Sequence, residues 1–374
     1  MSRHPVFCAI TQQPGHGGIA RVSSLVWHVL QQASKNRCRL IKLLPEGKQH
    51  ATVADKLRFI GTMLGEYSSQ NIDWIMYEHL GLARVQSLIP KPLRRPYAVF
   101  LYSIDSWNEL SPGRKRILRQ AEKRIAISHY TARRVATAHA DIGPIDVCHL
   151  ALAPTPSEIG VPIVDSRVPI SQSPIPAAGA DASLLERIQP NSVLIVGRML
   201  GSERHKGHDH LIDAWPLVMA RVPDAQLVIV GSGDDASRLE AKAASTCIAG
   251  GILFTGQVSD ETLESIYQRA ALFAMPSRGE GFGLVYLEAM QHRLPCIGSP
   301  QDAAAEIIED KVTGFLIDQS DISGLAQRIV TLLQNPSQRR EMGEAGYVRL
   351  QENFSFEQFK QRFLGILGSR FRIG

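Results

Sequence analysis

The sequence predicts an α/β protein of two domains, each with a mainly parallel sheet covered by helices. Three observations support this fold class. The chain has 374 residues, too many for one ordinary core and suited to two domains of roughly 150 to 200 residues each. Short apolar runs alternate with helical stretches, as in parallel α/β sheets. The alternation stops in a proline- and serine-rich stretch after residue 152 and resumes near residue 191, which indicates an interdomain crossover.

In the first half of the chain, the opening strand is expected at 6–10, with the sequence VFCAI. A glycine-containing loop follows it, and then an amphipathic helix from about Ile19 to Gln32. The later strands are expected in the short apolar runs RLIKLL, DWIMYEH, YAVFLYS, RIAIS and DVCHL. These runs are separated by helical or basic stretches, so a parallel sheet is favoured over hairpins.

The second half repeats this construction. Strands are expected in SVLIVG, QLVIVGSG, ILFTG, ALFAMPS, PCIGS and GFLID, with helices between them. We therefore predict an N-terminal domain at 1–165, a proline-rich linker at 166–190 and a C-terminal domain at 191–354. Residues 355–374 are predicted to form a separate amphipathic C-terminal helix.

Composition narrows the class of protein. The net charge is +5 and the pI is about 9.0, but there are no long Lys/Arg blocks of the kind that bind nucleic acid. A phosphate-bearing small ligand or an anionic membrane surface accounts for the charge equally well.

The cysteines are odd in number and form no CxxC pair: Cys8, Cys38, Cys148, Cys247 and Cys296. This favours a reducing compartment. With no signal peptide or apolar run of about eighteen residues, we expect a cytoplasmic protein, soluble or peripheral on the inner face of the membrane.

Ligands of parallel sheets bind beyond the carboxyl ends of the strands, so the loops there are informative. The first, PGHGGIAR, places Gly17 and Gly18 just before a helix. Adjacent glycines allow close approach to a ligand, and a helix N-terminus suits phosphate. A glycine-rich turn with no ligand fits this loop as well. Because the GxGxxG fingerprint is missing, a nicotinamide cofactor is not favoured.

The second loop, VGRMLGSERHKGHDH, carries two cations. Arg198 follows a strand and Lys206 precedes a helix. Together they could neutralise a diphosphate, or they could be solvated loop cations.

Two other sets of side chains raise the question of a metal. His205, His208 and His210 resemble zinc ligands, but no acid or cysteine nearby completes a tetrahedral set, so a solvated loop is favoured. Asp234 and Asp235 are adjacent, so their side chains diverge, and helix capping explains them better than a metal.

The stretch SRGEGFGLVYLEAM contains two glutamates in unusual surroundings. Glu280 lies in a glycine-rich loop, and Glu288 lies inside a nearly apolar helix that is expected to begin at Gly283. Free N–H groups at the start of that helix would point into the same space as Glu280. In the alternative, Glu288 is a paired core acid and Glu280 a surface residue.

These residues together resemble a known family. The run from Glu280 to Glu288 resembles the E-x7-E signature of the family 4 glycosyltransferases, which have the GT-B fold. The pairs GR at 197–198 and KG at 206–207 follow the same order and spacing, as do FTGQVSDETLESIYQRAALFAMPS and AAEIIEDKVTGFLID. In the first domain the resemblance rests on HGGIAR and on YAVFLYSIDSWNEL.

The resemblance implies a fold and a set of roles. The two domains would face each other across a cleft, and the C-terminal helix would return to the first domain. Arg198 and Lys206 would bind the donor diphosphate and stabilise it as leaving group, and Glu280 would bind the transferred sugar. Gln257 and Val258 would lie beside the base, and Glu288 would bind the ribose. The implied donor-binding residues are Gly17, Gly18, Gln257, Val258, Gly281, Phe282, Gly283, Leu284 and Glu288.

The resemblance also implies transfer with retention of configuration, in which negative charge grows on the diphosphate. Two cations and a helix N-terminus can carry that charge, and there is no convincing D-x-D sequence, so we expect no metal and no other cofactor. Many relatives have a histidine near the transferred sugar. The aligned position here is Tyr102, with Asp105 three residues on. Either could contact the donor or the acceptor, or both could be structural; Asp105 is the preferred site residue.

The acceptor is predicted from basic and apolar residues of the first domain. PKPLRRPY at 90–97 and RKRILRQAEKR at 114–124 suit anionic lipid headgroups or a lipid-diphosphate acceptor, although the second run also fits a solvated helix. The sequence resembles bacterial exopolysaccharide transferases that act on polyprenyl-linked or other glycan acceptors. We expect GDP-mannose as the donor, then UDP-glucose. A nucleotide-sugar epimerase and a non-catalytic nucleotide-sugar binding protein remain alternatives.

Overall fold

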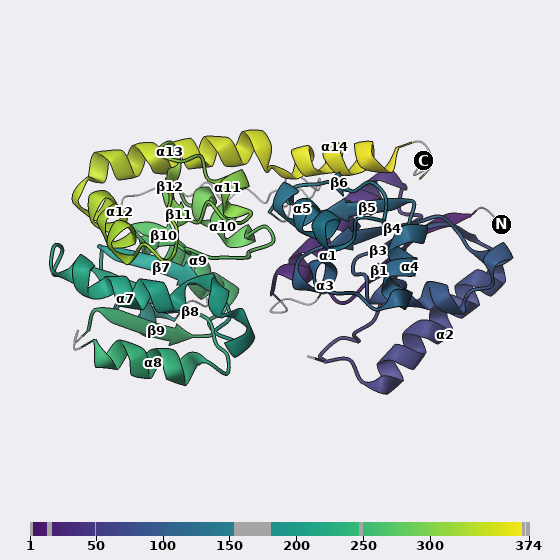
Figure 1. Ribbon diagram of the computed structural model, residues 1–374, viewed down its shortest axis with the longest axis horizontal. Coiled ribbons are helices and arrows are strands. Elements are labelled where there is room, and N and C mark those ends of the chain that lie inside the picture. Colours follow the sequence, from purple (N-terminus) through teal and green to yellow (C-terminus); the bar gives the residue numbers. More distant parts are fainter. Residues whose placement is uncertain are drawn as a thin grey trace. The chain divides into compact units, whose positions relative to one another are not determined.

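The computed structural model describes residues 3–12, 17–48, 50–152, 181–246, 250–368 and 371. The chain forms two compact units, one of residues 1–164 together with 354–374, and one of residues 165–353 (Figure 1). Most of the predicted linker, up to residue 180, lies outside the described residues, as does Cys247.

The first unit contains a six-stranded sheet in the order β2-β1-β3-β4-β5-β6, and all of its strand pairs are parallel. Its strands are β1 (His4–Ala9), β2 (Arg39–Lys42), β3 (Ile72–Tyr77), β4 (Tyr97–Leu101), β5 (Lys123–Ala126) and β6 (Asp146–Val147). β4 is buried along its whole length. A strand buried on both faces reads as a continuous apolar run, which is how the sequence predicted it.

Helices connect and cover these strands. They are α1 (Gly17–Ala33), α2 (Val53–Ser69), α3 (Ile104–Trp107), α4 (Pro112–Gln120) and α5 (His129–Ala138), with the 3-10 helices η1 (Leu82–Leu88) and η2 (Lys91–Leu93). α2 begins with a capping box, in which the Thr52 hydroxyl accepts from the Asp55 N–H and the Asp55 carboxylate accepts from the Thr52 N–H. These bonds satisfy N–H groups that the helix itself leaves unpaired.

The C-terminal helix α14 (Phe356–Leu367) belongs to the first unit and lies against its sheet (Figure 1, yellow). Phe363 stacks on Phe100 of β4 with ring centroids 5.7 Å apart, and Phe371 makes an edge contact with Trp74 of β3 at 5.1 Å. The predicted return of this helix to the first domain is confirmed. These aromatic contacts add stability beyond their apolar burial.

The second unit contains another six-stranded parallel sheet, in the order β12-β11-β10-β7-β8-β9. Its strands are β7 (Ser192–Val196), β8 (Gln226–Val230), β9 (Ile252–Gly256), β10 (Leu272–Ala274), β11 (Cys296–Gly298) and β12 (Gly314–Leu316). Its helices are α6 (Ala182–Leu185), η3 (Gly201–Lys206), α7 (His208–Met219), α8 (Ala236–Ser245), α9 (Asp260–Arg269), α10 (Leu284–Gln291), α11 (Ala304–Ile307), α12 (Ile322–Gln334) and α13 (Pro336–Asn353). The α/β class with two parallel sheets is confirmed.

The strand order reverses at one place in each sheet. In the first, β1 lies between β2 and β3; in the second, β7 lies between β8 and β10. The chain moves outward on one side of the first strand and then crosses to its other side. Loops diverge at such a switch point and leave a crevice at the carboxyl ends of the strands, where ligands of open α/β sheets bind. The loops after β7 and β10 are therefore the place to look for a site in the second unit.

Candidate functional site

The loops after β7 and β10 are joined to each other. The backbone N–H of Arg278 donates to the carbonyl oxygen of His205 at 2.7 Å. Gly207 has a φ of +93°, and a Cβ atom there would lie 2.6 Å from the carbonyl oxygen of Pro276, so only glycine fits. The loop that ends in Lys206 and the loop that carries Glu280 are thus held side by side at the switch point.

A carboxylate that sequence reasoning did not single out holds the two predicted cations together. Glu203 forms an ion pair through one oxygen with Arg198, and its other oxygen lies 2.8 Å from the Lys206 Nζ. The side chains of Lys206 and Glu203 are 14% and 15% exposed, whereas that of Arg198 is 68% exposed. Lys206 is therefore not a solvated loop cation, while Arg198 is open to solvent beside it. Their roles toward a diphosphate stay predictions.

The adjacent aspartates after β8 anchor this loop. Asp234 accepts the Gly201 N–H at 2.8 Å, and the buried Asp235 binds Arg204 at 2.8 Å. Arg238 binds Asp235 as well, at 2.6 Å, and its hydrogen bonds, followed by those of Arg204, hold the pKa of Asp235 well below its usual range. These contacts hold loops together, so Asp234 and Asp235 have a structural role. Their adjacent positions in the sequence had also favoured a structural role over metal binding.

The prediction of a solvated loop is wrong for one of the three histidines. His208 begins α7 and is buried, and burial lowers its pKa to about 4. A Cβ atom at Gly197 would lie 3.8 Å from its ring, so this imidazole packs under the end of β7. His208 is therefore neutral near pH 7 and adds no charge beside Lys206.

The loop that carries Glu280 rests on the buried Asp302, which lies between β11 and α11. Its Oδ2 accepts three hydrogen bonds, from the Ser277 hydroxyl at 2.7 Å, the Gly279 N–H at 3.1 Å and the Glu280 N–H at 3.0 Å. Its Oδ1 accepts from the Ala304 N–H at 3.0 Å. Burial raises the pKa of Asp302 despite these donors. This carboxyl group therefore fixes the backbone of the Glu280 loop.

Helix α10 begins where the sequence predicted it. Gly283 precedes the helix with a φ of +91°, and a Cβ atom there would lie 2.6 Å from the ring of Tyr286. Gly281, Phe282 and Gly283 are buried, and Leu284 is half-buried. The turn is too tight for a side chain at 283, which explains the glycine there. Donor binding by these residues stays a prediction.

Glu288 lies inside α10 and is 9% exposed. The hydroxyl of Tyr267 donates to its Oε2 at 2.9 Å, and the Tyr267 ring stacks on His292. The contacts agree with a paired acid, and the binding of ribose stays a prediction. Gln257 is exposed and Val258 half-buried; both follow β9 at the edge of the sheet, and their place beside a base is also untested.

In the first unit, two residues after β3 were missed by sequence reasoning. Glu78 is fully buried; the Ser23 hydroxyl donates to one of its oxygens and the Ile10 N–H to the other at 2.6 Å. Burial raises the pKa of Glu78 to about 7. The feature of the sequence that could have identified Glu78 is its position directly after an apolar strand, β3. This strand lies next to β1, at the switch point of the sheet. A carboxyl group that titrates near neutral pH in such a place is characteristic of functional sites.

The next residue, His79, contacts a predicted site residue. Its Nε2 lies 2.9 Å from the Asp105 carboxylate, and its Nδ1 accepts the Gly81 N–H at 2.9 Å. Since Nδ1 is an acceptor, the proton of a neutral ring is on Nε2. The Asp105 Oδ2 has no hydrogen-bond partner among the described residues, so this contact is one of proximity. Tyr102 is the residue that aligns with the histidine that many relatives have near the transferred sugar. That tyrosine is buried, its hydroxyl has no hydrogen-bond partner among the described residues, and burial raises its pKa.

The remaining candidates of the first unit are less defined. α1 begins at Gly17, and Gly18 is exposed, but residues 13–16 of their loop lie outside the described residues. Much of the basic run 114–124 is structural: Arg119 pairs with Asp141, Lys123 with Asp146, and Arg124 is buried against backbone carbonyls. Lys123 and Arg124 belong to β5, whereas the cations of helix α4 are exposed or half-buried, which agrees with the alternative of a solvated basic helix.

Comparison with known proteins gives a consistent result. Residues 181–349 match the family described as Glycosyl transferases group 1. A GDP-mannose-dependent monoacylated alpha-(1-6)-phosphatidylinositol monomannoside mannosyltransferase from Corynebacterium glutamicum is 31% identical over 70% of this chain and 67% of its own length. A GDP-mannose-dependent alpha-(1-6)-phosphatidylinositol monomannoside mannosyltransferase from Mycolicibacterium smegmatis is 27% identical over 91% of this chain and 86% of its own.

Solved structures agree on the fold. HepE from Anabaena, in complex with UDP and glucose, has a TM-score of 0.72 at 18% identity and covers 98% of this chain and 100% of its own. Sucrose-phosphate synthase from Thermosynechococcus elongatus has a TM-score of 0.75 at 18% identity, with full coverage of both chains. The GT-B fold and the resemblance found in the sequence are confirmed. The chain belongs to the group 1 glycosyl transferases.

Proposed function

We propose that the protein transfers mannose from GDP-mannose to a lipid-linked acceptor, with retention of configuration and without a metal ion. The observation that carries the proposal is the junction at the second switch point, where the Arg278 N–H donates to the His205 carbonyl. It holds a half-buried cation, Lys206, beside the loop of Glu280. The names of the two relatives reported above favour GDP-mannose over UDP-glucose.

In this proposal the diphosphate of the donor takes the place that the Glu203 carboxylate now occupies between Arg198 and Lys206. Both cations already meet an anionic group there, so a phosphate oxygen can replace the carboxylate without moving either side chain far. Glu280 binds hydroxyls of the mannose, and Glu288, oriented by Tyr267, binds the ribose. Gln257 and Val258 lie beside the guanine.

The chemistry follows from charge. As the bond from the sugar to the diphosphate breaks, negative charge grows on the leaving group. Lys206 is 14% exposed, so water screens its charge less than that of a free lysine. The first turn of α10 adds unpaired N–H groups, which carry partial positive charge. Preorganised donors of this kind lower a barrier by about 3 to 4 kcal/mol each, so no metal is required.

On the acceptor side, Asp105 and His79 form the polar group at the end of the first sheet. We assign them to contacts with the incoming hydroxyl or with the transferred sugar, in place of the histidine that relatives have at the position of Tyr102. The Ser103 N–H donates to the Asp105 Oδ1 at 3.2 Å and helps to orient this carboxylate.

A nucleotide panel tests the donor. Thermal unfolding is measured over the same series of concentrations of GDP, UDP and ADP; a nucleotide at about 100 times its dissociation constant adds about 2.7 kcal/mol to the stability. GDP should raise the melting temperature at the lowest concentration. The absence of any response to all three nucleotides would refute the proposal.

Hydrolysis and transfer assays test the chemistry. Slow breakdown of GDP-mannose should fall at least 100-fold in Lys206→Ala and in Glu280→Ala. It should be unchanged in Arg340→Ala, which removes an exposed cation from α13 of the same unit. Activity should persist in EDTA; loss in EDTA with recovery on adding Mg²⁺ or Mn²⁺ would refute metal independence. The anomeric configuration of the product, read by NMR, tests retention.

A further inference from the structure

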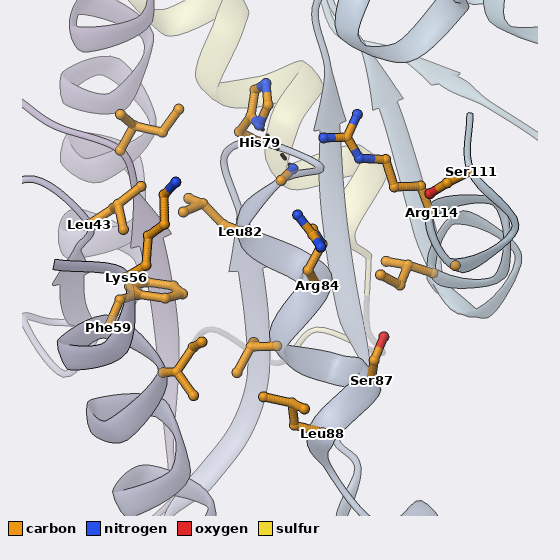
Figure 2. Close-up of a pocket in the computed structure, with 16 residues that line it drawn as sticks. Leu43, Lys56, Phe59, His79, Leu82, Arg84, Ser87, Leu88, Ser111 and Arg114 are labelled. Atoms are coloured by element: carbon orange, nitrogen blue, oxygen red, sulfur yellow. Dashed lines mark hydrogen bonds between the residues drawn. The ribbon is translucent and has the colours of Figure 1, made fainter. Parts of the chain in front are cut away.

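The first unit contains a cavity of about 620 Å³ between α2, η1 and α4 (Figure 2). Half of the residues that line it are apolar, among them Phe59 of α2, Leu82 of η1 and Ile117 of α4. Its volume falls within the range of small-molecule sites, which are mostly apolar with a few convergent polar groups.

Three cations line this apolar space, one from each of the surrounding helices: Lys56, Arg84 and Arg114. Figure 2 shows Lys56 and Arg114 extending from helices on either side, with Arg84 between them. None of the described residues that line the cavity is acidic. Within the described part of the chain, none of the three forms an ion pair or a side-chain hydrogen bond. Like charges gathered around an apolar space repel one another, so an anion bound among them is stabilised.

Exposed apolar residues lie on two of the elements that line the cavity, η1 and α2. Leu88 lines the cavity and is 55% exposed. On α2, Val53 and Leu57 are 72% and 63% exposed. They precede Ile60, which lines the cavity, by seven and three residues, so all three lie on one face of the helix. Large exposed apolar residues grouped in this way indicate contact with a membrane or an apolar ligand.

The polar end of the cavity lies at the acceptor side. His79 lines the cavity, and its Nε2 lies 2.9 Å from the Asp105 carboxylate. The cavity therefore joins an exposed apolar surface, a group of cations and the polar pair at the end of the first sheet. An amphiphile with a hydrocarbon chain, a phosphate and a sugar or hydroxyl end carries chemical groups that match these three parts of the cavity.

We infer that this cavity binds the acceptor as a lipid phosphate. The hydrocarbon chain enters past Leu88, and Lys56, Arg84 and Arg114 hold the phosphate. The hydroxyl that receives the sugar then lies toward His79. The inference rests on the proposed function, and it assigns a lipid site to residues that carry neither the donor nor the reaction.

The test uses farnesyl phosphate as the probe, with inorganic phosphate and farnesol as comparisons. Binding to the full chain is measured by calorimetry below the micelle concentration of the probe. Farnesyl phosphate should bind at least tenfold more tightly than either comparison ligand. Equal binding of inorganic phosphate would show a free-phosphate site, and equal binding of farnesol would show a purely apolar one; either result overturns the inference.

Variants locate the site. Arg84→Gln combined with Arg114→Gln should weaken farnesyl phosphate binding at least tenfold. The matched control is Arg116→Gln, which removes an exposed charge from the same helix outside the cavity and should bind as the wild type does. Wild-type affinity in the double variant overturns the inference.

The thermal response to GDP separates this inference from the proposed function. A double variant that keeps the GDP response but loses farnesyl phosphate binding is folded and supports the inference. A wild-type protein that responds to GDP but does not bind farnesyl phosphate overturns the lipid site alone. One that binds farnesyl phosphate but gives no response to any nucleotide refutes the proposed transfer and leaves the site standing.

Discussion

The buried carboxyl group of Glu78 should make the stability of the first unit depend on pH. Its pKa is about 7 in the folded protein, against an ordinary value of 4.5. The folded state therefore binds more protons than the unfolded state between these two values. Stability from this group is highest below pH 4.5, falls as the pH rises to 7 and stays low above it. At about 1.4 kcal/mol per pKa unit, the loss is about 3 kcal/mol.

The substitution Glu78→Gln isolates this effect. A glutamine has the same shape and no charge, and it can keep both contacts. Its carbonyl oxygen can accept the Ile10 N–H, and its amide can donate to the Ser23 hydroxyl, which can act as acceptor as well as donor. The variant should match the wild type near pH 4.5 and should be more stable by up to about 3 kcal/mol at pH 8.

The assay is urea unfolding of both proteins from pH 4.5 to 8, followed in the transition of the first unit. Only the difference between the two proteins is analysed, so other titrating groups cancel. Glu46→Gln is the control, because that side chain is 84% exposed and its loss should change stability by less than about 0.5 kcal/mol. A Glu78→Gln variant that is less stable than the wild type at pH 8, or a difference that does not vary with pH, would refute the reasoning.

Three further substitutions probe the second unit. Asp302→Ala leaves four donors without their acceptor and should lower the free energy of unfolding by about 3 kcal/mol in urea; a loss below about 1 kcal/mol would mean that this carboxylate does not hold the Glu280 loop. Glu203→Gln removes a negative charge from between the two cations, so calorimetry should show severalfold tighter GDP binding at low salt, whereas weaker binding would mean that Glu203 is needed to orient Lys206. Tyr267→Phe removes the hydrogen bond to Glu288 and should weaken GDP binding by about 1 kcal/mol; unchanged affinity would speak against Glu288 as a donor contact.

Much of the fold was predictable because buried parallel strands are continuous apolar runs. DWIMYEH covers β3 except for its first residue, Ile72, and YAVFLYS contains β4; the start of α10 followed from Gly283. The partners of the predicted site residues were not predictable. Asp302 follows a different strand from the one before Glu280, and only the order of strands in the sheet brings the two together.

Other misses have similar causes. Glu203 lies in a loop whose folding into a 3-10 helix gives no periodic signal. His79 was read as the end of a strand, because nothing in its neighbourhood shows that Asp105 will reach it from beyond β4. His208 was expected to be solvated, yet its ring is covered by the end of β7 at the start of α7. For His79 the decisive contact joins segments that are distant in the sequence. Glu203 and His208 instead contact residues of their own loop and of the end of β7, and only the folding of that loop brings them together.

The position of α14 has a consequence for biosynthesis. The first unit begins the chain, but its sheet is covered by residues 356–367, which follow the whole second unit. Phe100 and Trp74 meet their aromatic partners on that segment only after it has left the ribosome. The unit that is translated first is thus completed last, after the second unit has been made. Shortening the chain at its C-terminal end should therefore destabilise the first unit and leave the fold of the second unchanged.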